Sequence, residues 1–197
     1  LIADTLSLSG ASLTNSGLLQ GSHLLSLQTG SLTNVAGGSL YSKQDLTLDI
    51  PALDNRGLIT TDGALWLKGD TLTSQGEING VSLRSDYRSV NNLGTGRLLA
   101  DNTLILNGAT LNNSGLMAAD SVQIASGDLQ NAGEVQGNHA LTLDAASVSN
   151  SGVLHSNGAL DLQGGALTNT GELSATTLLL NLTRQATNGA DGRIIGR

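Results

Sequence analysis

A pair of aliphatic residues separated by one residue recurs along the whole chain. From Leu6 to Leu178 it repeats over nine intervals that average about 19 residues. Self-similarity at a fixed period of this length is the mark of repeat proteins, in which each unit buries its apolar face against its neighbours. The ten pairs are Leu6/Leu8, Leu25/Leu27, Leu46/Leu48, Leu65/Leu67, Val81/Leu83, Leu104/Leu106, Val122/Ile124, Leu141/Leu143, Leu160/Leu162 and Leu178/Leu180.

Each pair is followed by a second pattern, apolar-x-Asn-x-Gly-x-aliphatic. The aliphatic and Asn positions alternate with variable ones, and a period of two predicts strands with one buried face. The Asn column consists of Asn15, Asn34, Asn55, Asn113, Asn131, Asn150 and Asn169. The Gly column consists of Gly17, Gly57, Gly76, Gly115, Gly133, Gly152 and Gly171.

These columns predict an all-β fold, a right-handed parallel β-helix of about ten rungs with three short strands per rung. The composition agrees: there is no Phe, one Trp and two Tyr, so the core is thin and aliphatic. The chain has 26 Gly but one Pro, which suits tight corners in a hydrogen-bonded sheet. Leucine-rich repeats place Asn differently, helical repeats need a 3.6-residue period, and the glycine-rich calcium-binding repeat is absent.

The recurrence of Asn in nearly every rung indicates a structural role, with two interpretations. In one, its amides form a ladder in which each NH2 group donates to the next rung. In the other, Asn tolerates a tight bend with positive φ, and the two roles are compatible with each other.

Some rungs depart from the pattern. An extra residue occurs at 35–38, Ser74 stands where Asn is expected, and Gly80 shortens a corner. The rungs at 81–99 and 177–195 are one variant that returns after 96 residues, which favours an architectural role. The alternative is a candidate interaction surface formed by Arg84, Asp86, Tyr87, Arg88 and Arg97.

The sequence gives no compact set of catalytic or metal-binding residues, so we expect no enzyme and no cofactor. His23 and His139 share one rung position six rungs apart, about 29 Å, which is too far for a shared metal ion. Glu77, Glu134 and Glu172 also share one outward position, and neighbours in this set are about 10–14 Å apart. Trp66 is expected to project outward alone.

Charge and hydropathy limit the classes of partner that the chain is expected to bind. The net charge of −7 and the nine scattered Lys and Arg residues argue against nucleic acid. No apolar stretch approaches 18 residues, so no membrane insertion is expected. The chain has no Cys, which suits both cytosolic proteins and proteins exported unfolded.

The unit is similar to the haemagglutinin repeat of two-partner-secretion exoproteins, and residues 104–117, LILNGATLNNSGLM, show it best. That family includes filamentous haemagglutinin adhesins and the effectors of contact-dependent growth inhibition. The resemblance implies a secreted, monomeric filament at the outer surface of a Gram-negative bacterium, exported by an outer-membrane two-partner-secretion transporter.

We therefore expect residues 1–197 to form one β-helix segment cut from a longer filament. It would act as a non-catalytic stalk that projects receptor-binding or toxin modules from the cell, in an adhesin or a growth-inhibition effector. Two alternatives remain: a β-helix enzyme that degrades polysaccharides, and a segment that itself binds a host glycan or a receptor on a host or neighbouring bacterial cell.

Overall fold

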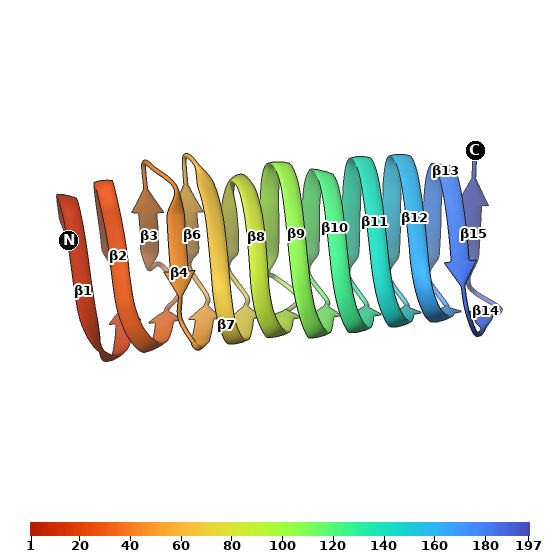
Figure 1. Cartoon of the computed structure of the whole chain (residues 1–197), viewed down its shortest axis with the longest axis horizontal. Coiled ribbons are helices and arrows are strands. Elements are labelled where there is room, and N and C mark those ends of the chain that lie inside the picture. Colours follow the sequence, from red (N-terminus) through yellow and green to blue (C-terminus); the bar gives the residue numbers. More distant parts are fainter.

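The computed structural model describes residues 1–197 as a stack of turns along one axis, with the termini at opposite ends (Figure 1). All strand pairs are parallel and belong to one sheet system. No helix long and apolar enough to cross a membrane is present. The strands are β1 (Ile2–Asn15), β2 (Leu18–Asn34), β3 (Ser39–Ser42), β4 (Leu46–Asp49), β5 (Ala52–Asn55), β6 (Leu58–Thr61), β7 (Ala64–Ser74), β8 (Glu77–Asn92), β9 (Arg97–Asn113), β10 (Leu116–Asn131), β11 (Glu134–Asn150), β12 (Val153–Asn169), β13 (Glu172–Leu182), β14 (Ala186–Asn188) and β15 (Arg193–Gly196).

Each turn contains three straight segments. In β10 the first segment buries Met117, the second buries Val122 and Ile124, and the third buries Leu129 and Asn131. In the turn from β3 to β5 the three segments are separate strands, whereas from β9 to β12 each turn is one strand that continues through its corners. The predicted parallel β-solenoid of about ten stacked turns is confirmed.

Equivalent residues stack on one another, as the repeat pattern predicts. Leu104 pairs with Val122, Val122 with Leu141, and Leu141 with Leu160. These columns join into one hydrophobic core of 38 buried residues that runs along the rod. Each fully buried aliphatic side chain contributes about 2 kcal/mol, but only when the adjoining turns cover it.

The predicted pair Val81/Leu83 is wrong by two residues. Leu83 pairs with Leu65 and Ser85 with Leu67, so Leu83 and Ser85 occupy the two pair positions. Val81 lies at the preceding corner and is only half-buried. Val81 lies an even number of residues from the buried Leu83, Ser85 and Tyr87, so a period of two fits both registers. Choosing the more aliphatic pair selects the wrong one.

Two kinds of connection join the Asn at the end of one turn to the Gly before the next turn. Most turns use Asn-x-Gly, but three use Asn-x-x-x-Gly, at 34–38, 92–96 and 188–192. The second and third belong to the predicted variant rungs, in which Arg97 and Arg193 form ion pairs with glutamates of the preceding turn. The connection at 34–38 has the same form, so the longer connection is not confined to a spacing of five turns.

Candidate functional site

The Asn column forms a ladder of buried side-chain amides. In each step Nδ2 of one Asn donates to Oδ1 of the Asn one turn closer to the C-terminus, and the N···O distances are 2.7–2.9 Å. The same Nδ2 groups also contact backbone carbonyls, as Asn113 does with Gly115 and Glu134. No residue other than Gly has a positive φ. The ladder interpretation is thus confirmed, and the positive-φ interpretation is wrong.

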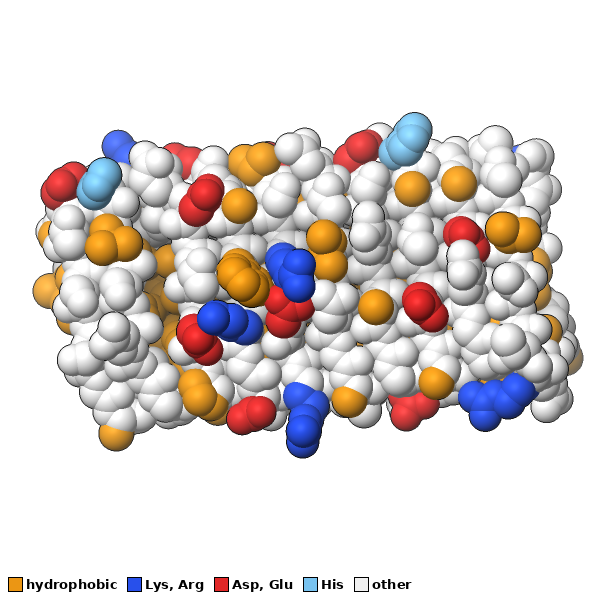
Figure 2. Space-filling model, viewed as in Figure 1, with side chains coloured by type: hydrophobic (Ala, Val, Ile, Leu, Met, Phe, Trp, Pro, Cys, Tyr) orange, Lys and Arg blue, Asp and Glu red, His pale blue; other side chains and the backbone are white.

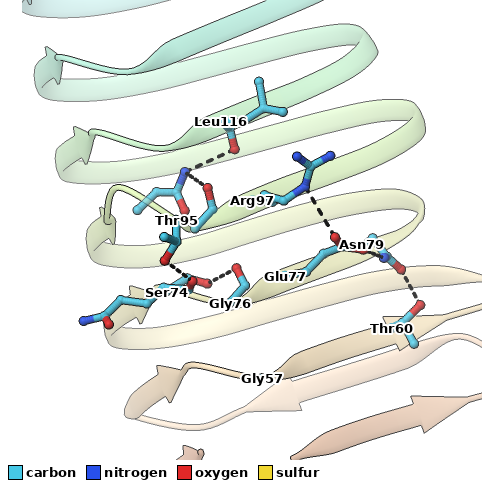
Figure 3. A network of polar contacts seen from close by, with 12 residues as sticks. Gly57, Thr60, Ser74, Gly76, Glu77, Asn79, Thr95, Arg97 and Leu116 are labelled. Atoms are coloured by element: carbon cyan, nitrogen blue, oxygen red, sulfur yellow. Dashed lines mark hydrogen bonds and ion pairs between the residues drawn. The ribbon is translucent and has the colours of Figure 1, made fainter. Parts of the chain in front are cut away.

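The ladder is interrupted at Ser74. Asn55 Nδ2 reaches Ser74 Oγ at only 3.4 Å, and Ser74 Oγ donates to the carbonyl of Gly76 at 3.1 Å (Figure 3). Asn92 lies one turn further on and is fully buried, and its Oδ1 has no hydrogen-bond partner. Buried acceptors without partners cost free energy. Asn92 was not predicted as a ladder member, because the Asn of the other turns lies nine residues after the first member of the aliphatic pair, and the incorrect pair Val81/Leu83 places that position at Val90.

Close backbone packing requires glycine at every position of the Gly column except Gly17, where an added Cβ would meet nothing within 4 Å. A Cβ atom on Gly76 would lie 2.1 Å from the carbonyl oxygen of Gly57, and Gly133, Gly152 and Gly171 meet the preceding Gly in the same way. Because these contacts involve backbone atoms, a side chain cannot be accommodated by a rotamer change. The Gly column therefore holds successive turns at strand spacing.

The candidate interaction surface is only partly assembled. Arg84 and Asp86 lie together on the outer face of β8, where Arg84 Nε is 2.7 Å from Asp86 Oδ2. Arg97 lies at the start of β9 and contacts Glu77 instead (Figure 3). Arg88 is exposed at a separate corner.

Tyr87 does not belong to this surface. Its side chain is fully buried, and its hydroxyl donates to the carbonyl of Ile50, two turns away, at 2.7 Å. It fits because the intervening turn has Gly69 there, whose added Cβ would lie 2.7 Å from the Tyr87 ring. Burial, and to a lesser degree the charge of Asp49, raises the pKa of the Tyr87 hydroxyl far above its ordinary value. Tyr87 thus connects three turns from inside the solenoid.

Trp66 projects outward as predicted but is not alone. Its Nε1 donates to Asp86 Oδ2 at 2.6 Å, and the cationic groups of Lys68 and Arg84 lie 5.1 and 5.6 Å from its ring centroid. Lys68 also forms an ion pair with Asp49 at 2.9 Å. In Figure 2 basic and acidic side chains gather around a hydrophobic one in the middle of this face.

Asp86 is the centre of this cluster. It accepts hydrogen bonds from Arg84, Asn107 and Trp66, which come from three successive turns. Partial burial acts to raise the pKa of Asp86, but these hydrogen bonds and the charge of Arg84 outweigh it, and the pKa lies below its usual value. Asp86 therefore stays ionised and ties the three turns together on the outer face.

The histidines and glutamates do not converge on a shared centre. His155 Nδ1 lies 2.9 Å from Ser174 Oγ, and its Nε2 lies 3.0 Å from Asn157 Oδ1. Glu77 and Glu172 each form an ion pair with an arginine of the next turn. No group of three His, Cys, Asp or Glu side chains lies close enough together to hold a metal ion.

Comparison with known proteins gives partial matches to CdiA proteins. Toxin CdiA of Escherichia coli is 41% identical over 88 residues, which is 45% of this chain and 3% of that protein. The tRNA nuclease CdiA of E. coli O6:K15:H31 matches to the same extent. The 16S rRNA endonuclease CdiA of Enterobacter cloacae subsp. cloacae is 36% identical over 116 residues, 59% of this chain and 4% of that protein. No family model and no solved structure matches the chain.

These names correct one expectation. The sequence predicts a protein without enzymatic activity, whereas two of these relatives are named nucleases. The inference fails because it rests on residues within one segment, and the chain spans only 3–4% of the length of these relatives. Since no family model matches, the resemblance to haemagglutinin repeats stays a prediction. The chain is a parallel β-solenoid with sequence similarity to CdiA proteins over about half of its length.

Proposed function

We propose that residues 1–197 form part of the rod of a contact-dependent growth inhibition exoprotein. The observation that carries the proposal is the unbroken stack of parallel turns, combined with the similarity to CdiA proteins. In this proposal the segment acts as a stiff spacer between the cell surface and modules that recognise or inhibit a neighbouring cell. Ten turns at the strand spacing of about 4.8 Å give a length of about 48 Å.

The proposal includes the cellular context. The relatives come from Gram-negative bacteria, which supports a protein secreted to the outer cell surface. Export would use an outer-membrane two-partner-secretion transporter, and a chain without Cys is compatible with passage in an unfolded state. The ladder and the Gly column support folding by addition of turns, since each folded turn presents a complete set of partners to the next one.

Deleting whole and partial turns in the full-length exoprotein tests the spacer role. Removing residues 134–152 joins Gly133 to Val153 and preserves every column, because Glu134 and Val153 are paired equivalents. Removing residues 140–149 takes out about half a turn and disrupts the columns. We expect the whole-turn deletion to retain surface display and growth inhibition of target cells, and the half-turn deletion to lose both.

Surface labelling and a co-culture competition assay provide the two measurements. If the whole-turn deletion is displayed normally but no longer inhibits target cells, the segment acts through particular residues and not as a spacer. If the half-turn deletion is displayed and active, the register of the columns is irrelevant to function, and the rod proposal is wrong.

A further inference from the structure

A groove runs along one side of the solenoid, at the corner between the first and second segments of each turn. Its volume is about 860 Å³, and its walls come from five consecutive turns. Four spacings of about 4.8 Å give it a length of about 19 Å. The lining residues are Thr60, Thr61, Asp62, Asn79, Gly80, Val81, Leu99, Ala100, Asp101, Ala118, Ala119, Asp120, Gln136 and Asn138.

Unequal corner lengths produce this groove. The turns differ in how many residues lie at this corner. In β8 only Val81 lies between the paired residues Gly80 and Ser82. The turns on either side have two corner residues each, at 62–63 and 101–102. The register shift between Gly80 and Ser82 marks this difference. The shorter corner is flanked by longer ones, and the hollow lies between them. A second one-residue corner, at Asp120, extends it.

The floor and the rim of the groove differ in chemistry. The floor is aliphatic and is formed by Val81, Leu99, Ala100, Ala118 and Ala119. All charged lining residues are carboxylates, namely Asp62, Asp101 and Asp120, and no Lys, Arg or His lines the groove. None of these three carboxylates takes part in any of the five ion pairs of the protein.

Two of the three carboxylates are held in place by neutral donors. The Tyr41 hydroxyl donates to Asp62 Oδ2 at 2.6 Å, and Asn138 Nδ2 donates to Asp120 Oδ1 at 3.1 Å. The hydrogen bond to Asp62 also raises the pKa of Tyr41. The carboxylates are thus positioned but not neutralised, and the groove retains a negative potential.

We propose that this groove binds an extended segment of a protein partner that carries two or three lysine or arginine residues. The methylene groups of such side chains can cover the aliphatic floor while their cationic ends reach the aspartates. The side-chain amides of Asn79, Gln136 and Asn138 provide hydrogen-bonding groups for an extended backbone. At about 3.3 Å per residue, the groove accommodates about six residues.

Other ligand classes fit this lining less well. Nucleic acids and anionic polysaccharides are repelled, because all charges in the groove are negative. A metal ion lacks a cluster of three ligating side chains. A neutral glycan would leave the carboxylates without counter-charges and would find no aromatic side chain in the groove. The inference is independent of the proposed spacer role.

Fluorescence anisotropy with the 197-residue protein tests the proposal. The probe is a fluorescein-labelled six-residue peptide of alternating lysine and serine, and the same peptide with glutamate for lysine is the negative control. The groove variant combines Asp62→Asn, Asp101→Asn and Asp120→Asn. The matched control combines Asp4→Asn, Asp70→Asn and Asp144→Asn, three exposed aspartates outside the groove that form no ion pair.

Both triple variants change the net charge by the same amount, so the comparison separates local recognition from general attraction. We expect the groove variant to bind the lysine peptide at least about tenfold more weakly than the unmodified protein. The control variant should bind within about twofold of it. Circular dichroism checks that both variants remain folded.

Three results would overturn the proposal. One is equal loss of affinity in both variants, which would indicate nonspecific attraction. Another is the absence of saturable binding of the lysine peptide at low salt. The third is binding of a neutral linear hexasaccharide that competes with the peptide and persists in the groove variant, which would identify the groove as a glycan site.

Discussion

Replacing Ser74 with Asn should repair the side-chain ladder and stabilise the protein. The neighbouring positions in the column, Asn55 and Asn92, are fully buried Asn residues, so the column accommodates a carboxamide. An Asn at position 74 would accept from Asn55, where Ser74 offers only a 3.4 Å contact, and would donate to the unpartnered Oδ1 of Asn92. By analogy with Asn55 and Glu77, it would also donate to the carbonyl of Arg97.

The magnitude follows from these groups. A net hydrogen bond contributes about 1 kcal/mol, and an unpartnered buried acceptor costs about 1–3 kcal/mol. Ordering the longer side chain offsets about 1 kcal/mol of this gain. We therefore expect Ser74→Asn to raise the free energy of unfolding by about 1–2 kcal/mol. For a chain of this size, that corresponds to an increase in Tm of about 3–6 °C.

Thermal and urea unfolding followed by circular dichroism measures this change, and Asn131→Ser is the matched control. Asn131 lies in the uninterrupted part of the ladder, where it accepts from Asn113 and donates to Asn150. The control should lower stability by a similar amount. If Ser74→Asn leaves stability unchanged or lowers it while Asn131→Ser is clearly destabilising, the unpartnered Oδ1 of Asn92 is not the cause of a local weakness, and the reasoning fails.

Three further predictions concern the turns around this break. Tyr87→Phe should cost about 1–2 kcal/mol in urea unfolding, because it removes only the hydrogen bond to Ile50; no change would mean that the bond is not formed in solution. The lowered pKa of Asp86 means that its contribution to stability is present above the unfolded-state pKa and is lost as the pH falls through the folded-state pKa. Asp86→Asn should therefore flatten the fall in Tm between about pH 5 and pH 2, and an unaltered profile would contradict this. Gly76→Ala should destabilise strongly or prevent folding, whereas Gly94→Ala, where an added Cβ contacts nothing within 4 Å, should be nearly neutral in the same melting experiment.

Most of the fold can be predicted from the alternation of apolar and polar residues. The incorrect register at Val81/Leu83, however, prevented the prediction of the cluster around Trp66. With Val81 as the equivalent of Leu65, Trp66 lies beside a serine and stands alone. With the observed pairing of Leu65 and Leu83, Trp66 lies directly beside Arg84. A period of two cannot choose between these registers, since both bury alternate residues. In the observed register Tyr87 lies beside Gly69, where an added Cβ would lie 2.7 Å from the Tyr87 ring, and this fit exists only once the turns are stacked.

The groove could not be predicted from the sequence, although one of its causes could. The short corner at Gly80 is apparent from the spacing, but its consequence depends on the longer corners on either side of it. Consecutive aspartates of the rim lie 39 and 19 residues apart in the sequence, and no motif connects them. Stacking alone brings them to one side of the rod.

The amide ladder also gives the rod a direction. Every carboxamide has its NH2 group toward the C-terminal end and its oxygen toward the N-terminal end. The side-chain dipoles therefore add along the axis, and each amide polarises the next. A rod that adds turns at its C-terminal end would present donors there, ready to orient the Asn of the incoming turn. At Ser74 this alignment is interrupted, so the molecule contains two consecutive dipole chains and a single junction between them.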